Sequence, residues 1–235
     1  MKKLSLVIVL LGIFAVAGIS QERETTMAEL SPKLVRSSAI QTSAPFRCVT
    51  VTERYDKKGG QVIDRTTTTQ EVITSTTLRS TTEYWPEKDR PSVEQVSVAG
   101  VKYRRIGGQG WKLVTGVFSV VNSGTGVGSI AGPIPIRSEQ SNKVFSLGNE
   151  LLDGKTTGVY EMRVTVTKTY SSGEISKALT DTRYWFFDNG ELAKRLTVTD
   201  DVANGVYAKT TLRFAYENIN TKIEVPVLDS EKSDK

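Results

Sequence analysis

Few side chains of this chain of 235 residues could carry out chemistry, because it has no histidine and a single cysteine, Cys48. The absence of histidine removes Ser-His-Asp and Cys-His catalysis and histidine-ligated zinc. Cys48 has no second cysteine with which to form an intramolecular disulfide. It stands in residues 46–49, at the start of an expected strand, where we expect a small buried hydrophobic side chain rather than a reactive thiol. We therefore expect no cofactor and no metal.

Pairs of carboxylates are the remaining catalytic option, as in glycoside hydrolysis, where the two carboxyl groups lie about 5–9 Å apart. The available residues are Asp181, Asp188, Glu191, Asp200 and Asp201. All of them stand beside turn signals, where acidic residues are common for conformational reasons. We therefore expect no catalytic residues and no enzymatic activity.

The charge pattern bears on the class of partner. The chain has 31 Lys+Arg and 26 Asp+Glu, a net charge of +5. The basic residues are scattered, and Lys57-Lys58 and Arg104-Arg105 are only short pairs. A scattered excess is typical of a solvated surface, so nucleic acid is not an expected partner.

The first 20 residues have the pattern of a secretory signal peptide. Lys2 and Lys3 precede an apolar run over residues 4–17, and the small residues Gly18 and Ser20 follow. The run is shorter than the roughly 20 apolar residues of a membrane-spanning helix. No cysteine follows it to serve as the acylation site of a lipoprotein. We expect cleavage after residue 20, a flexible segment over 21–30, and a periplasmic or secreted protein.

The remainder reads as antiparallel β-structure. Apolar and polar residues alternate from 206 to 217, the period of two of a half-covered strand. The turn signals are Ser171-Ser172-Gly173, Asp188-Asn189-Gly190 and Asn204-Gly205. Strands are predicted over 46–55, 62–74, 78–85, 93–98, 101–106 and 111–114, after a short helix over 31–41 that opens with Ser31-Pro32. The glycine-rich residues 122–133 are interpreted as a connection, with a lid over a cavity as the alternative.

This order of elements resembles the LolA/LppX-type lipoprotein-carrier superfamily of bacterial envelopes. The resemblance covers roughly residues 31–228 and is greatest in Tyr184-Trp185-Phe186-Phe187-Asp188-Asn189-Gly190 and the long strand after it. It implies one mainly β (α+β) domain, a strongly curved antiparallel sheet forming an open half-barrel covered by a few short helices and loops, followed by a polar tail over 229–235. It also implies a non-catalytic carrier whose partner is a lipid or an acylated protein. The helices that plug the barrel of such carriers have no counterpart in residues 122–133.

A physical argument also favours a bound apolar guest. A sheet with one apolar face must cover it with another sheet, with helices or with a ligand, and this chain offers few spare apolar segments. The alternative is that the sheet folds on itself and the same residues form its core. A second candidate function is an exported structural module that docks another envelope protein. The expected ligand-binding residues are Val49, Val51, Tyr55, Tyr84, Val96, Val98, Tyr103, Trp111, Val164, Val166, Tyr184, Phe186, Leu212 and Phe214.

Overall fold

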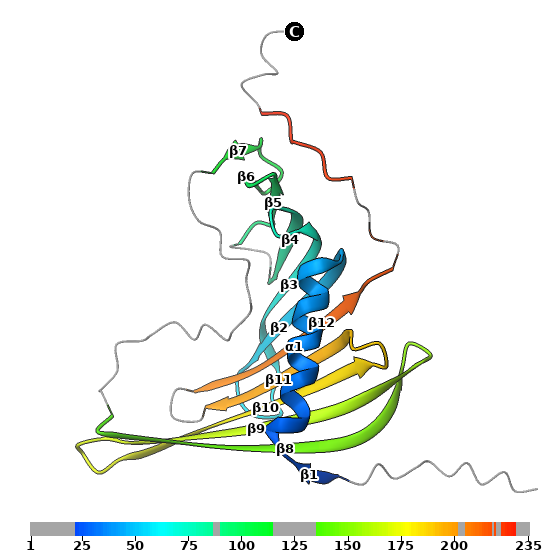
Figure 1. Cartoon of the computed structure of the whole chain (residues 1–235). Helices are drawn as coiled ribbons and strands as arrows, with labels where there is room; N and C mark the ends of the chain where they lie inside the picture. The colour runs from blue at the N-terminus through cyan, green and yellow to red at the C-terminus, as the bar shows by residue number, and fades with distance from the viewer. Residues whose placement is uncertain are drawn as a thin grey trace, which may run out of the picture.

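In the computed structural model the described residues form one antiparallel sheet that is crossed by one long helix (Figure 1). The structure describes residues 22–86, 90–114, 135–201, 205–217, 219 and 222–228. The predicted signal peptide, the glycine-rich residues 122–133 and the polar tail over 229–235 lie outside the described residues.

Across the described ranges the sheet has twelve strands, and the first and last strands in its spatial order do not pair with each other, so it is open rather than closed into a barrel. The spatial order is β1-β8-β9-β10-β11-β12-β2-β3-β4-β5-β6-β7. The longest strands, β8 and β9, are bent along their length (Figure 1). The expected fold class, a mainly β protein built on a curved, open antiparallel sheet, is confirmed. The strands are β1 (Arg23–Thr25), β2 (Phe46–Tyr55), β3 (Val62–Thr74), β4 (Thr77–Trp85), β5 (Val93–Val98), β6 (Val101–Ile106), β7 (Lys112–Leu113), β8 (Arg137–Leu152), β9 (Lys155–Thr169), β10 (Ile175–Phe187), β11 (Leu192–Asp201) and β12 (Val206–Ala215).

Threonine and valine dominate these strands, because a side chain branched at Cβ favours extended backbone. The turn between β10 and β11 shows how the predicted turn residues act. Gly190 has a φ of +88°, which a side chain would disfavour, and its N–H donates to the carbonyl of Phe187. The chain therefore reverses at the predicted glycine.

The helix α1 (Met27–Ser43) is longer than predicted and begins earlier. Pro32 lies inside it, not at its first helical position as the sequence suggested, so that prediction was wrong. The reason is tertiary: the early start places Leu30 in the core with no exposed surface. The free energy gained by burying this leucine outweighs the backbone hydrogen bond that proline cannot donate. Within the described residues α1 is the sole α-helix, where several short ones were expected.

The helix lies across one face of the sheet, from β8 towards the end of β12 (Figure 1). Leu30 packs in one cluster with Val144 of β8 and Tyr184 of β10, and the far end is fixed by Gln41, whose Nε2 donates to the hydroxyl of Tyr216 over 3.3 Å. We call the face that carries Tyr184 and Phe214 the helix-side face. The opposite face, which carries Glu161, is called the outer face.

Candidate functional site

The pairing register divides the fourteen expected ligand-binding residues between the two faces. Directly opposed residues of antiparallel strands point to the same face, and neighbours along a strand alternate. Val49 opposes Arg213, whereas Cys48 opposes Phe214, so Val49 and Phe214 lie on different faces. The helix-side face carries Tyr84, Val164, Val166, Tyr184, Phe186, Leu212 and Phe214. The outer face carries Val49, Val51, Tyr55, Val96, Val98 and Tyr103. Trp111 precedes β7, forms a bridge with Leu228 and lies under the guanidinium of Arg105.

The helix-side face changes character away from α1. Its threonines pair across strands, with hydroxyl oxygens 3.3 Å apart in Thr182 and Thr197 and 3.2 Å apart in Thr52 and Thr210. Threonine contributes a methyl group but also a hydroxyl that must be hydrogen-bonded. Away from α1 this face therefore mixes threonine pairs with apolar side chains such as Val164 and Val166.

A cavity of about 350 Å³ opens between the second and third turns of α1 and the ends of β9 and β10. Its volume falls within the range of roughly 300–1,000 Å³ of small-molecule sites. The residues that line it are Pro32, Lys33, Arg36, Asn149, Gly158, Tyr160, Phe186, Phe187, Asp188 and Gly190. We call this space the helix pocket.

Aromatic rings form the apolar wall of the helix pocket. The Tyr160 and Phe186 rings meet edge to face with centroids 6.3 Å apart, and Phe186 stacks on Tyr184 at 6.1 Å. Phe186 and Tyr184 are each less than one-tenth exposed, so their positions are fixed by the core. The wall is thus preformed.

Two basic residues of α1 line the helix pocket. Lys33 and Arg36 are three residues apart on α1, so their side chains leave the helix in similar directions. The Lys33 Nζ lies 5.2 Å from the centroid of the Tyr160 ring. A Cβ placed on Gly190 would be 2.6 Å from Arg36 Cδ, so the arginine side chain lies flat against the β10–β11 turn. One carboxylate, Asp188, shares the lining.

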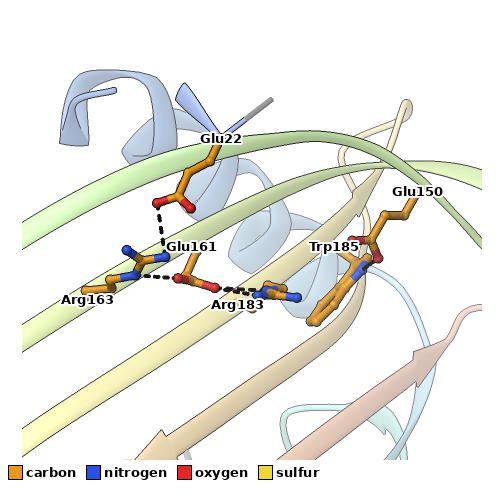
Figure 2. Close-up of polar contacts among 6 residues, drawn as sticks. All are labelled: Glu22, Glu150, Glu161, Arg163, Arg183 and Trp185. Atoms are coloured by element: carbon orange, nitrogen blue, oxygen red, sulfur yellow. Dashed lines mark hydrogen bonds and ion pairs between the residues drawn. The ribbon is translucent and has the colours of Figure 1, made fainter. Parts of the chain in front are cut away.

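The outer face carries a network of ion pairs instead (Figure 2). The Glu161 carboxylate accepts from Arg183 Nη2 over 2.7 Å through one oxygen and from Arg163 Nε over 2.6 Å through the other. Arg163 also pairs with Glu22 at 3.1 Å. Burial alone would raise the pKa of Glu161, but the two arginines outweigh it and lower the pKa. The network ties the N-terminal segment, β9 and β10 together.

Beside this network the Trp185 indole N–H donates to Glu150 over 2.7 Å (Figure 2). Lys194 Nζ lies 4.4 Å from the centroid of the same indole ring. The buried tryptophan therefore has its polar group satisfied, as an interior indole requires. The hydrogen bond joins β8 to β10, and the Lys194 contact joins β11 to β10.

A second cavity, of about 290 Å³, lies on the outer face and contains two of the acidic residues considered for catalysis, Asp181 and Asp200. Its charges are already paired in part, with Lys58 Nζ 3.1 Å from Asp200 and Arg183 bound to Glu161. Burial, followed by the charge of Glu161, raises the pKa of Asp181. Leu179, Leu196 and Val198 line the same cavity, so it combines apolar side chains with these partly paired charges.

The remaining chemical candidates are placed as follows. Cys48 is buried, as predicted, and burial raises the pKa of its thiol to about 11. Across the described ranges no group of three or more Cys, Asp or Glu residues is arranged to hold a metal ion. The same ranges contain no helix with the length and hydrophobicity needed to cross a membrane.

Sequence reasoning missed most of the helix pocket. Of the fourteen expected residues only Phe186 lines it, and Tyr160, Phe187, Lys33 and Arg36 were not predicted. The available signal was the spacing of Leu30, Leu34, Ser37 and Gln41, which places four residues on one side of a helix that begins before residue 30. With that longer helix, Lys33 and Arg36 would have flanked its buried side.

The comparisons with known proteins concern the fold. No protein-family model and no curated protein matches the chain. Among solved structures, LprF from Mycobacterium bovis is 11% identical with a TM-score of 0.43, covering 85% of this chain and 97% of that one. A protein described as an outer membrane lipoprotein-sorting protein domain, from Vibrio parahaemolyticus, is 9% identical with a TM-score of 0.28, covering 82% of this chain and 92% of that one. At these similarities the matches say nothing of what this chain binds.

Proposed function

We propose that this protein is a non-catalytic, extracytoplasmic binding protein that holds a lipid or an acyl chain in the helix pocket. The observation that carries the proposal is a cavity of about 350 Å³ beside α1, with the Tyr160 and Phe186 rings in its lining. In the part of the chain that the structure describes, the protein has one sheet layer, so α1 alone covers the apolar residues at this end of the helix-side face. A bound lipid can cover the apolar surface that the helix leaves exposed.

The energetics suit an apolar chain. Burial of apolar surface is worth about 25 cal/mol per Å², so a chain that buries a few hundred Å² gains several kcal/mol. The Tyr160 and Phe186 rings lose no conformational entropy on binding, because Tyr184, Leu192 and α1 already hold them. Asp188 is the one carboxylate in the described lining, so the pair of carboxylates that glycoside hydrolysis needs is not assembled in this pocket.

Titration with dansyl-undecanoic acid tests the proposal. We expect a saturable blue shift of the dansyl emission, together with lipid adducts in native mass spectra of protein exported to a bacterial periplasm. Absence of both signals in protein shown to be folded by circular dichroism would contradict it.

One observation favours the second candidate, an interaction module. β1 pairs only with residues 144–146 of β8, and residues 137–143 of β8 are exposed and have no strand on their outer edge within the described ranges. Such an edge can accept a strand from another protein. The test is a pull-down with wild type and with the double variant Ser141→Pro/Asn142→Pro. Successive N–H groups of a strand point to opposite edges, so one of the two prolines removes a donor of the free edge, and circular dichroism checks that the variant is folded. A defined partner lost in the variant supports this function, and equal capture by both proteins contradicts it.

A further inference from the structure

We propose that the helix pocket selects amphiphiles with an anionic head group, a carboxylate or a phosphate, which binds between Lys33 and Arg36. The inference rests on the proposed function and specifies its ligand class. It depends on three features of the pocket: the number of charges that line it, the way in which the two cations are held, and the position of the aromatic wall.

The charges that line the pocket are unequal. Lys33 and Arg36 face the single carboxylate of Asp188, which leaves a positive excess in the pocket. Several arginines of the sheet are matched by carboxylates: Arg163 and Arg183 pair with Glu161, and Arg105 pairs with Glu94. Within the part of the chain that the structure describes, neither Lys33 nor Arg36 forms an ion pair. Their positive charge is thus available to a ligand.

Contacts place both cations at the pocket. The ammonium of Lys33 stands over the Tyr160 ring, an arrangement in which the ring's electron-rich face attracts the charge. The Arg36 stem lies beside Gly190, since a Cβ built on that glycine would be 2.6 Å from Arg36 Cδ, and the arginine is exposed to solvent. The Lys33 contact is therefore partly preorganised, and the Arg36 guanidinium can reach a head group bound beside it.

The geometry also orders the ligand. Lys33 and Arg36 extend from the helix, whereas Tyr160 and Phe186 rise from the sheet. An anionic head group bound by the two cations would direct its tail onto the rings. A cationic or neutral head group would leave the charges of Lys33 and Arg36 unmatched. Selection by head group thus follows from the same pocket that holds the tail.

Isothermal titration calorimetry tests the inference, with four probes at concentrations below micelle formation: dodecyl phosphate, dodecanol, dodecyltrimethylammonium and inorganic phosphate. We expect dodecyl phosphate to bind at least about tenfold more tightly than dodecanol, the factor expected from one charge-assisted contact. Dodecyltrimethylammonium should bind more weakly than dodecanol. Inorganic phosphate, which has no tail, should show no measurable binding. The preference for dodecyl phosphate should fall with added salt, since the cations are near the surface.

The variant Lys33→Gln/Arg36→Gln should lose the preference for dodecyl phosphate over dodecanol and keep the affinity for dodecanol. Lys177→Gln, which removes a lysine at an exposed outer-face position, is the matched control and should behave as wild type. Equal affinity of the wild-type protein for dodecyl phosphate and dodecanol would overturn the head-group inference while leaving the proposed function intact. Failure of every tailed probe to bind would overturn both. A preference that survives in the double variant, or tight binding of inorganic phosphate alone, would also overturn the inference.

Discussion

The Lys33 ammonium lies 5.2 Å from the centroid of the Tyr160 ring, which joins the helix and the sheet at the mouth of the helix pocket. Lys33 belongs to α1 and Tyr160 to β9, so the two residues are far apart in the sequence and adjacent in the fold. The contact is partly exposed, so it contributes little to folding stability. Its consequence is to place a positive charge beside an aromatic wall.

The docking of α1 depends on one leucine. Leu30 has no exposed surface, and Leu30→Ala should reduce the free energy of unfolding by about 2–5 kcal/mol through lost burial and a residual cavity. Urea denaturation measures the change. Val35→Ala, on the same helix at a position that is 67% exposed, is the control and should shift the free energy by less than about 0.5 kcal/mol. Equal effects of the two substitutions would contradict the packing described for α1.

The ion pairs of Glu161 on the outer face should make the free energy of unfolding depend on pH. Arg183 and Arg163 lower the pKa of Glu161 below the ordinary glutamate value of 4.5. A group whose pKa is lower in the folded state stabilises the protein above its unfolded pKa and loses that contribution as the pH falls through its folded pKa. Glu161→Gln should therefore cost about 1–2 kcal/mol near neutral pH, a value kept small because both arginines are partly exposed.

The difference between wild type and Glu161→Gln should shrink as the pH is lowered from about 7 to about 3, because the wild-type carboxylate takes up a proton first in the unfolded state and then, at lower pH, in the folded state. Thermal or urea unfolding of both proteins across this range checks the prediction. Glu139→Gln, which alters an exposed ion pair with Arg137 on β8, is the control and should change little at any pH. A Glu161 effect that persists unchanged at the acidic end would show that the network acts through packing rather than charge.

Cys48 should be chemically inert in the native protein. Burial raises the pKa of its thiol to about 11, so the thiolate that attacks disulfide reagents is scarce near pH 8. We expect reaction with Ellman's reagent to be slow in buffer and fast in denaturant. Rapid modification of the folded protein at the rate of a free thiol would mean that the strand β2 does not shield Cys48 as described.

Much of the fold was predictable from the sequence because its signals are local. The boundaries of β2, β3, β5 and β6 match the predicted strands, since alternation and turn residues determine both ends of each. The start of α1 was not predictable in the same way. Ser31-Pro32 is a valid local signal for a helix start, and only the burial of Leu30 against strands more than a hundred residues later overrides it.

The binding residues were harder to predict than the strands. Val49 and Phe214 were expected on one face and lie on different ones. Their faces follow from the register between β2 and β12, which depends on long-range pairing rather than on either strand alone. A shift of one residue reverses the face of every side chain in a strand. The helix pocket, moreover, takes Lys33 and Arg36 from a helix whose orientation no local pattern reveals.

Filling the helix pocket tests the central claim most directly. A Cβ on Gly158 would lie 3.8 Å from Asn149 Oδ1 and 3.9 Å from Tyr160 Cε2, ordinary contact distances, so Gly158→Leu should fold and place its added atoms in the pocket. Thr167→Leu adds a leucine to the outer face of the same strand and serves as the control. We predict that Gly158→Leu weakens binding of dansyl-undecanoic acid at least about tenfold, because the leucine side chain occupies space in which the ligand would bury apolar surface. Thr167→Leu should bind the ligand as wild type does. Undiminished binding by a folded Gly158→Leu protein would show that the ligand does not occupy the helix pocket.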